Sequence, residues 1–167
     1  MSKGYYIVYR VFGAIMNLLA CLTLVFCISL IFEVGLQPDL LAPLFVSACM
    51  VIYTTLSRLF FVTVMKNRQP LRRNLKDWII ANAVVSILGL GYVAANPITL
   101  LINRSQMQGL IAAFNNQLST TASSKTMPVT VHMMVGVCVF LIAVLLTGLI
   151  HCIWTLVLVK RNKAYFQ

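Results

Sequence analysis

The chain has 167 residues, of which 60% are hydrophobic and only 10% are charged, and its mean hydropathy is +0.92. Soluble domains carry about 45–50% apolar and about 25% charged residues, so this composition excludes an ordinary soluble domain. The long apolar runs also argue against a disordered chain. The sequence therefore predicts an integral membrane protein.

The net charge of +10 would point to a nucleic-acid partner in a soluble protein. Here the cations gather at the ends of the apolar segments, so we expect no nucleic acid among the partners. Positively charged residues in short loops stay on the cytoplasmic side of a membrane. Ten of the thirteen Lys and Arg residues lie in the N-terminal segment, the 66–77 loop or the C-terminal tail. This distribution predicts that both termini are cytoplasmic and that the chain spans the cell (cytoplasmic or inner) membrane.

A helix that crosses the hydrocarbon core needs about 20 predominantly apolar residues. Four segments meet this requirement, at about 11–32, 40–65, 78–96 and 131–159. Because proline disrupts a helix, we expect Asn96–Pro97 to close the third segment. The sequence therefore predicts an all-α fold in which residues 1–167 form a single four-helix membrane domain. A tight hairpin between the first two spans is indicated by Glu33, Gly35, Pro38 and Asp39.

The segment 98–130 is the only sizeable one outside the predicted spans, on the outer side. Ser105 and Gln108 are three residues apart, as in a capping box. We predict a short amphipathic helix on the outer membrane surface, followed by a flexible link over 119–126. The residues that recur at helical spacing and would form its apolar face are Met107, Leu110, Ile111, Phe114 and Leu118.

The inner basic loop, 66–77, has Leu71, Leu75 and Trp78 at helical spacings, and Pro70 suits a first helical turn. We predict a helical run-in to the third span. The five cations of this loop would lie beside anionic lipid headgroups, which adds about 1 kcal/mol of attraction for each. These candidate headgroup ligands are Lys66, Arg68, Arg72, Arg73 and Lys76. Aromatic residues predicted near the inner interface are Tyr5, Tyr6, Tyr9, Trp78, Trp154, Tyr165 and Phe166.

Side chains that carry out catalysis or bind metals are sparse and scattered. The five cysteines lie inside predicted spans without a CxxC pair, and His132 and His151 are about 28 Å apart along one helix. The three carboxylates, Glu33, Asp39 and Asp77, lie at predicted interfaces. The sequence contains no HExxH, GxSxG, Walker A or GxGxxG pattern. We therefore expect no enzyme activity, no cofactor and no metal site.

One group of polar residues is defined by depth rather than by a motif. Each of the four predicted spans carries a polar side chain roughly 8 to 14 Å inside the inner edge. Polar side chains in a membrane usually face the bundle interior, so we expect them to meet. Hydrogen bonding between helices, worth about 0.6 kcal/mol for each bond, would explain most of them. This candidate polar cluster consists of Arg58, His151, Asn82, Ser86 and Asn17.

Arg58 needs a further explanation, because an arginine at a helix centre costs about 2.5–3.5 kcal/mol on insertion scales and no span contains a carboxylate. Three explanations are open. The second apolar segment is longer than the hydrocarbon core, so Arg58 can extend to a lipid phosphate. A partner subunit can supply a carboxylate. Alternatively, an anionic ligand can bind from the cytoplasmic side with help from Asn82 and His151.

These observations predict a non-catalytic multi-pass membrane protein that is a subunit or self-assembling component of a membrane complex. The alternative is a small transporter or channel for an anionic or polar solute, with a cytoplasm-facing site around Arg58. The expected partners are membrane lipids with anionic headgroups on the inner side, and a partner subunit or further copies of this chain.

Overall fold

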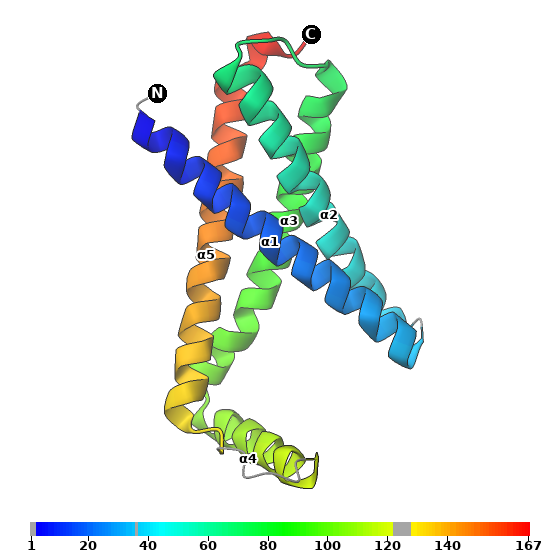
Figure 1. Cartoon of the computed structure of the whole chain (residues 1–167), viewed down its shortest axis with the longest axis vertical. Coiled ribbons are helices and arrows are strands. Elements are labelled where there is room, and N and C mark those ends of the chain that lie inside the picture. The colour runs from blue at the N-terminus through cyan, green and yellow to red at the C-terminus, as the bar shows by residue number, and fades with distance from the viewer. Residues whose placement is uncertain (1–2, 36, 122–127) are drawn as a thin grey trace. The chain divides into compact units, whose positions relative to one another are not determined.

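A computed structural model of the chain describes residues 3–35, 37–121 and 128–167 (Figure 1). These residues are almost entirely helical, and four of the helices are long and apolar enough to cross a membrane. The prediction of an all-α fold with four helices of this length and apolarity is therefore confirmed, whereas the orientation of the termini stays a prediction. The elements are α1 (Lys3–Val34), α2 (Pro38–Phe60), the π-helical η1 (Phe61–Lys66), α3 (Arg73–Ile102), α4 (Arg104–Thr121), α5 (Val131–Arg161) and the short 3-10 helix η2 (Lys163–Tyr165).

The chain divides into two compact units. The first unit consists of Met1–Leu90 and Leu146–Gln167, and the second is Gly91–Leu145. The first unit therefore holds α1, α2, η1, the first part of α3 and the last part of α5. The second unit holds the remainder of α3, all of α4 and the start of α5.

The predicted hairpin between the first two spans is present in the first unit. Gly35 ends α1 with a φ of 78°, a conformation that glycine adopts without a steric penalty, and its N–H donates to the Ile31 carbonyl oxygen at 2.9 Å. Pro38 then opens α2, where its missing N–H leaves no hydrogen bond unmade. Asp39 lies in the first turn, next to the positive end of the helix dipole. The short connection makes α1 and α2 antiparallel neighbours (Figure 1).

The predicted end of the third span at Asn96–Pro97 is wrong, because α3 continues through Pro97 to Ile102. A proline removes one backbone hydrogen bond, and membrane helices tolerate this where other groups satisfy the freed backbone. The missing N–H of Pro97 frees the Val93 carbonyl oxygen, four residues earlier, and the Pro97 side chain is buried. The third helix is therefore longer than its apolar pattern indicates.

The helix predicted in the outer segment is present as α4, but its N-cap differs from the prediction. Asn103, not Ser105, caps the helix, since the Asn103 Oδ1 accepts from the Gln106 N–H at 3.3 Å and from the Ser105 hydroxyl at 2.8 Å. Asn is among the strongest N-cap residues because its side-chain oxygen reaches the N–H three residues on. The capping box from Ser105 to Gln108 is therefore wrong.

The apolar residues of α4 divide between two environments. Met107 and Ile111 are buried, whereas Leu110 and Phe114 are exposed. The side chain of Leu118 lies outside the described residues. Of the predicted flexible link over 119–126, residues 119–121 belong to α4 and residues 122–127 lie outside the described part of the chain. The position of α4 on a membrane surface stays a prediction.

The inner loop of the first unit is paired with the C-terminal tail. The Leu71 N–H donates to the Tyr165 carbonyl oxygen at 2.7 Å, and the Gln167 N–H donates to the Leu71 carbonyl oxygen at 3.0 Å. The Arg73 N–H, at the start of α3, donates to the Gln167 carbonyl oxygen at 2.9 Å. The prediction of Pro70 in a first helical turn is wrong, because this pairing holds the chain extended until Arg73. Figure 1 shows the C-terminus beside the connection between α2 and α3.

The tail also adds aromatic surface to the core of the first unit. The Phe166 ring stacks on Phe60 with centroids 5.7 Å apart. Tyr9, which was expected in an interfacial aromatic belt, is instead 2% exposed and stacks on Phe61 at 4.5 Å. Trp154 packs edge-on against Tyr9 at 5.7 Å. The buried residues of this core are Tyr9, Phe60, Phe61, Val64, Leu71, Ile79, Leu158 and Val159.

We expect Phe166→Ala to lower the free energy of unfolding by about 1–2 kcal/mol, because it removes a half-buried ring and its stacking on Phe60. Thermal unfolding in detergent measures the loss, and amide hydrogen exchange should show faster exchange at Leu71 and Arg73. The matched control is Lys163→Ala, an exposed change in the same tail. Equal exchange in both variants would contradict a structural role for the tail.

Candidate functional site

A buried hydrogen-bond network joins three helices of the first unit through the hydroxyl of Thr155. The Tyr9 hydroxyl from α1 lies 2.8 Å from Thr155 Oγ1, and the Tyr53 hydroxyl from α2 lies 2.9 Å from the same atom. Thr155 Oγ1 in turn donates to the His151 carbonyl oxygen at 2.9 Å on α5. The Tyr53 hydroxyl also lies 2.9 Å from His151 Nδ1. We call Tyr9, Tyr53, His151 and Thr155 the Thr155 network, and all four side chains are buried.

Each hydroxyl hydrogen of this network has an acceptor within reach. Thr155 has one hydroxyl hydrogen and donates it to the His151 carbonyl oxygen, so its two lone pairs accept from Tyr9 and Tyr53. The Tyr53 hydroxyl also lies within reach of two atoms of His151, Nδ1 at 2.9 Å and the carbonyl oxygen at 3.2 Å. This arrangement satisfies every hydroxyl group of the network.

The Nε2 atom of His151 is buried and has no hydrogen-bond partner in the described part of the chain. Gly13 of α1 lies directly over it, since a Cβ at this position would come within 3.1 Å of Nε2. The absence of a side chain at Gly13 therefore allows α1 to pass close to the imidazole ring. The network thus leaves one polar atom of the histidine unmatched beneath α1.

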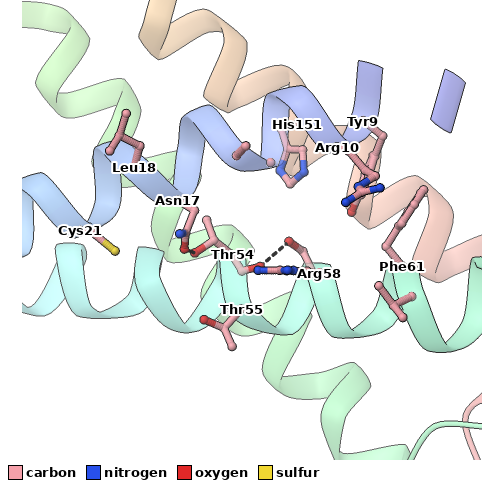
Figure 2. A pocket seen from close by; sticks show the side chains of 14 residues that line it. Tyr9, Arg10, Asn17, Leu18, Cys21, Thr54, Thr55, Arg58, Phe61 and His151 are labelled. Atoms are coloured by element: carbon pink, nitrogen blue, oxygen red, sulfur yellow. Dashed lines mark hydrogen bonds between the residues drawn. The ribbon is translucent and has the colours of Figure 1, made fainter. Parts of the chain in front are cut away.

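A cavity of about 600 Å³ lies between α1 and α2, above this histidine. Figure 2 shows the Arg10 side chain reaching from α1 toward α2, and Asn17 facing Thr54 across the gap. Thr54 Oγ1 donates to Asn17 Oδ1 at 3.0 Å. The Arg10 guanidinium also lies over the Tyr6 ring, 5.7 Å from its centroid. We call this cavity the α1–α2 pocket, and its lining residues are Tyr9, Arg10, Gly13, Ala14, Asn17, Leu18, Cys21, Thr54, Thr55, Ser57, Arg58, Phe61, Val62 and His151.

The structure brings together three of the five residues of the candidate polar cluster. Arg58, Asn17 and His151 line the α1–α2 pocket, whereas Asn82 and Ser86 do not. Asn82 donates to the Trp78 carbonyl oxygen at 2.8 Å and Ser86 to the Asn82 carbonyl oxygen at 2.7 Å, so both bond to the backbone of their own helix. The cluster was defined by position along each helix, and three of its members line one pocket. The other two do not, because their side chains face the backbone of their own helix.

Sequence reasoning missed Arg10 and Tyr53 as site residues, and placed Tyr9 at the interface. A tyrosine in the middle of an apolar helix normally finds a hydrogen-bond partner for its hydroxyl, and Tyr53 carries that signal. Thr155 lies four residues after His151 and therefore on the same face of α5. These two signals together could have located the network.

The lining of the pocket contains two guanidinium groups, Arg10 and Arg58, and no carboxylate. Such a cavity attracts an anion. A comparison with known protein families, curated proteins and solved structures gives no match to this chain. Its function must therefore be argued from its own residues.

We expect Thr155→Val to lower the free energy of unfolding by about 1–3 kcal/mol, because two buried tyrosine hydroxyls lose their common acceptor. Thermal unfolding in detergent measures this. Thr155→Ser keeps the hydroxyl and should restore most of the stability. The control is Thr55→Val, which removes an exposed hydroxyl bonded only to the Val51 carbonyl oxygen of its own helix. If the two valine variants are equally stable, the network does not hold the helices together.

Proposed function

We propose that this chain is a non-catalytic multi-pass protein of the cell membrane that acts as a subunit or self-assembling component of a membrane complex, with both termini on the cytoplasmic side. The single observation that carries the proposal is an exposed face of α3 that has the composition of a helix-association surface.

This α3 face belongs to the second unit and combines small and polar side chains. Gly91 and Ala95 are exposed, and space around Gly91 is open, since a Cβ added there would meet nothing within 4 Å. Tyr92, at 79% exposure, and Asn96 lie one turn apart on the same face. Among the described residues neither side chain has a hydrogen-bond partner. Thr99 completes the α3 face, which we define as Gly91, Tyr92, Ala95, Asn96 and Thr99.

Membrane helices associate through surfaces of this kind. Small residues let two backbones approach, and polar side chains form hydrogen bonds across the contact. An asparagine amide without a partner is unfavourable in hydrocarbon, so pairing Asn96 with another helix lowers the free energy of the assembled state. A further copy of this chain or a different subunit can supply that helix.

The non-catalytic part of the proposal is supported by the way His151 is used. Its Nδ1 and its carbonyl oxygen are both engaged in the Thr155 network, so the imidazole holds helices together. A histidine general base in a nucleophile–base pair would instead need a nearby nucleophile and a group that orients the ring.

We expect Asn96→Leu to shift the protein toward the monomer or to lose a partner subunit, because it removes the amide hydrogen bonds across the contact. The expected loss of affinity is about threefold or more. Native mass spectrometry of protein extracted from its own membrane in mild detergent measures the assembly. Phe140→Leu, an exposed change on α5, is the control. A chain that is monomeric and without protein partners in its own membrane would overturn the proposal.

A second candidate function is a small transporter or channel for an anionic or polar solute. The observation that favours it is the α1–α2 pocket, which places Arg58, Arg10 and Asn17 around one cavity. Under this hypothesis, proteoliposomes that contain the protein should show an anion flux that Arg58→Gln reduces at least about tenfold. Arg161→Gln, which removes an exposed cation outside the pocket, should leave the flux unchanged. A flux equal to that of empty liposomes would rule this function out.

A further inference from the structure

We propose that the α1–α2 pocket binds a membrane amphiphile that carries an anionic phosphate or carboxylate headgroup. The inference rests on the same site as the second candidate function and names its ligand. It requires binding only, so it holds whether or not the ligand is transported and whether or not the chain assembles through the α3 face.

The charge of the pocket selects an anion. Arg10 and Arg58 come from two different helices and line one cavity, and no Asp or Glu is among the lining residues. Of the three carboxylates, Glu33 and Asp39 lie at the far end of the α1–α2 hairpin, and Asp77 is exposed on α3 and does not line the pocket. Two guanidinium groups without a counter-charge repel each other, and an anion between them removes that repulsion and accepts charge-assisted hydrogen bonds.

The pocket also offers polar groups that the fold leaves unused. The Asn17 amide lies 3.0 Å from Thr54 Oγ1, whose single hydrogen has a second acceptor in the Val51 carbonyl oxygen at the same distance, so the exposed amide keeps polar capacity for a ligand. The His151 ring lines the pocket from α5, and its Nε2 is the one buried side-chain polar atom of the described residues that lacks a hydrogen bond. A headgroup with anionic oxygens would match the two guanidinium groups and the Asn17 amide.

The order of residues along the pocket indicates an amphiphile rather than a free anion. Arg10 and Asn17 lie two helical turns apart on α1, and Arg58 lies opposite on α2, between the levels of Phe61 and Thr54. Beyond Asn17 the lining becomes apolar, with Leu18 and Cys21 exposed to the hydrocarbon. A headgroup held by the two arginines would therefore place its chain along Leu18 toward the middle of the membrane.

The size of the pocket agrees with this occupant. A volume of about 600 Å³ falls in the range of about 300–1,000 Å³ that is usual for small-molecule sites. It exceeds what a single carboxylate side chain from a partner subunit would fill. A headgroup together with the first part of an acyl chain uses both the polar and the apolar part of the lining.

The test is a titration of delipidated protein, in neutral detergent, with phosphatidic acid, lysophosphatidic acid and phosphatidylcholine, read by native mass spectrometry. We expect saturable binding of the two anionic lipids and little retention of the zwitterionic one. Arg58→Gln and Arg10→Gln should each weaken anionic-lipid binding at least about tenfold, because each removes charge-assisted hydrogen bonds. Arg58→Lys should recover part of the affinity.

The matched control is Arg161→Gln, which removes the same charge from an exposed position at the end of α5, outside the pocket. If it weakens binding as much as Arg58→Gln, the lipid is held by general surface charge and the inference is wrong. Binding of inorganic phosphate as tight as that of lysophosphatidic acid would show that the acyl chain contributes nothing, which overturns the amphiphile. If the wild type retains a protein partner instead of lipid and Arg58→Gln loses that partner, Arg58 binds a carboxylate of the partner and the inference is wrong.

A thermal unfolding curve for each variant shows whether the fold is kept. The Arg58 side chain is exposed and has no hydrogen bond within the described chain, so its replacement should leave the melting temperature of lipid-free protein unchanged. Added phosphatidic acid should then raise the melting temperature of the wild type and not that of Arg58→Gln. Lipid binding without anion flux would exclude the transport hypothesis and leave this inference standing. Anion flux without lipid binding would exclude this inference and leave the transport hypothesis standing.

Discussion

The oxygen of the Thr155 hydroxyl, which joins α1, α2 and α5, is the point on which the arrangement of the first unit depends. No water competes for hydrogen bonds in hydrocarbon, so a polar group inside a membrane helix must be satisfied by another part of the protein. Tyr9 and Tyr53 both reach Thr155 within 2.9 Å, and this requirement fixes how far each helix is rotated and shifted. Apolar packing alone would leave that register open, because one apolar side chain replaces another at little cost.

The same register creates the pocket. Tyr9 is turned toward α5, and Arg10, the next residue along α1, is rotated by about 100° and so faces α2. On α2, Arg58 follows Tyr53 by five residues, which rotates it away from the network by about 140°. Gly13 lets α1 lie against His151, and Gly148 does the same for Met16, since a Cβ at either position would crowd its neighbour. Because the hydroxyls of Tyr9 and Tyr53 bond inward to Thr155, Arg10 and Arg58 face the same cavity.

The parts of the fold that composition controls could be predicted, and those that depend on a single contact could not. Four spans and the α1–α2 hairpin follow from apolar length and from Gly35 and Pro38. The inner loop could not be predicted, because its conformation depends on pairing with Gln167, almost a hundred residues away in the chain. The end of α3 was misjudged because Pro97 costs a helix less inside a membrane than in water.

The sequence predicts how far along each helix the candidate residues lie, but only in part the direction in which their side chains project. A count of residues from the basic boundary puts Arg58 and His151 at a similar depth, since rise per residue is constant in a helix, and both residues line the pocket. That count contains no information on rotation, and Asn82 turned out to bond to the backbone of its own helix. Locating the pocket also required the direction in which each side chain projects. Tyr9 and Tyr53 carry this information, because both hydroxyls bond to Thr155.

The two polar surfaces left without partners call for different molecules. Arg58 and Arg10 need negative charge, which a lipid headgroup or another anion supplies, and an apolar helix cannot supply it. Asn96 and Tyr92 need hydrogen-bonding groups on a closely approaching surface, which lipid chains lack and a second helix provides. The lining residues of the α1–α2 pocket and the residues of the α3 face do not overlap. The loss of one kind of binding without the other is therefore the expected behaviour of variants in either surface.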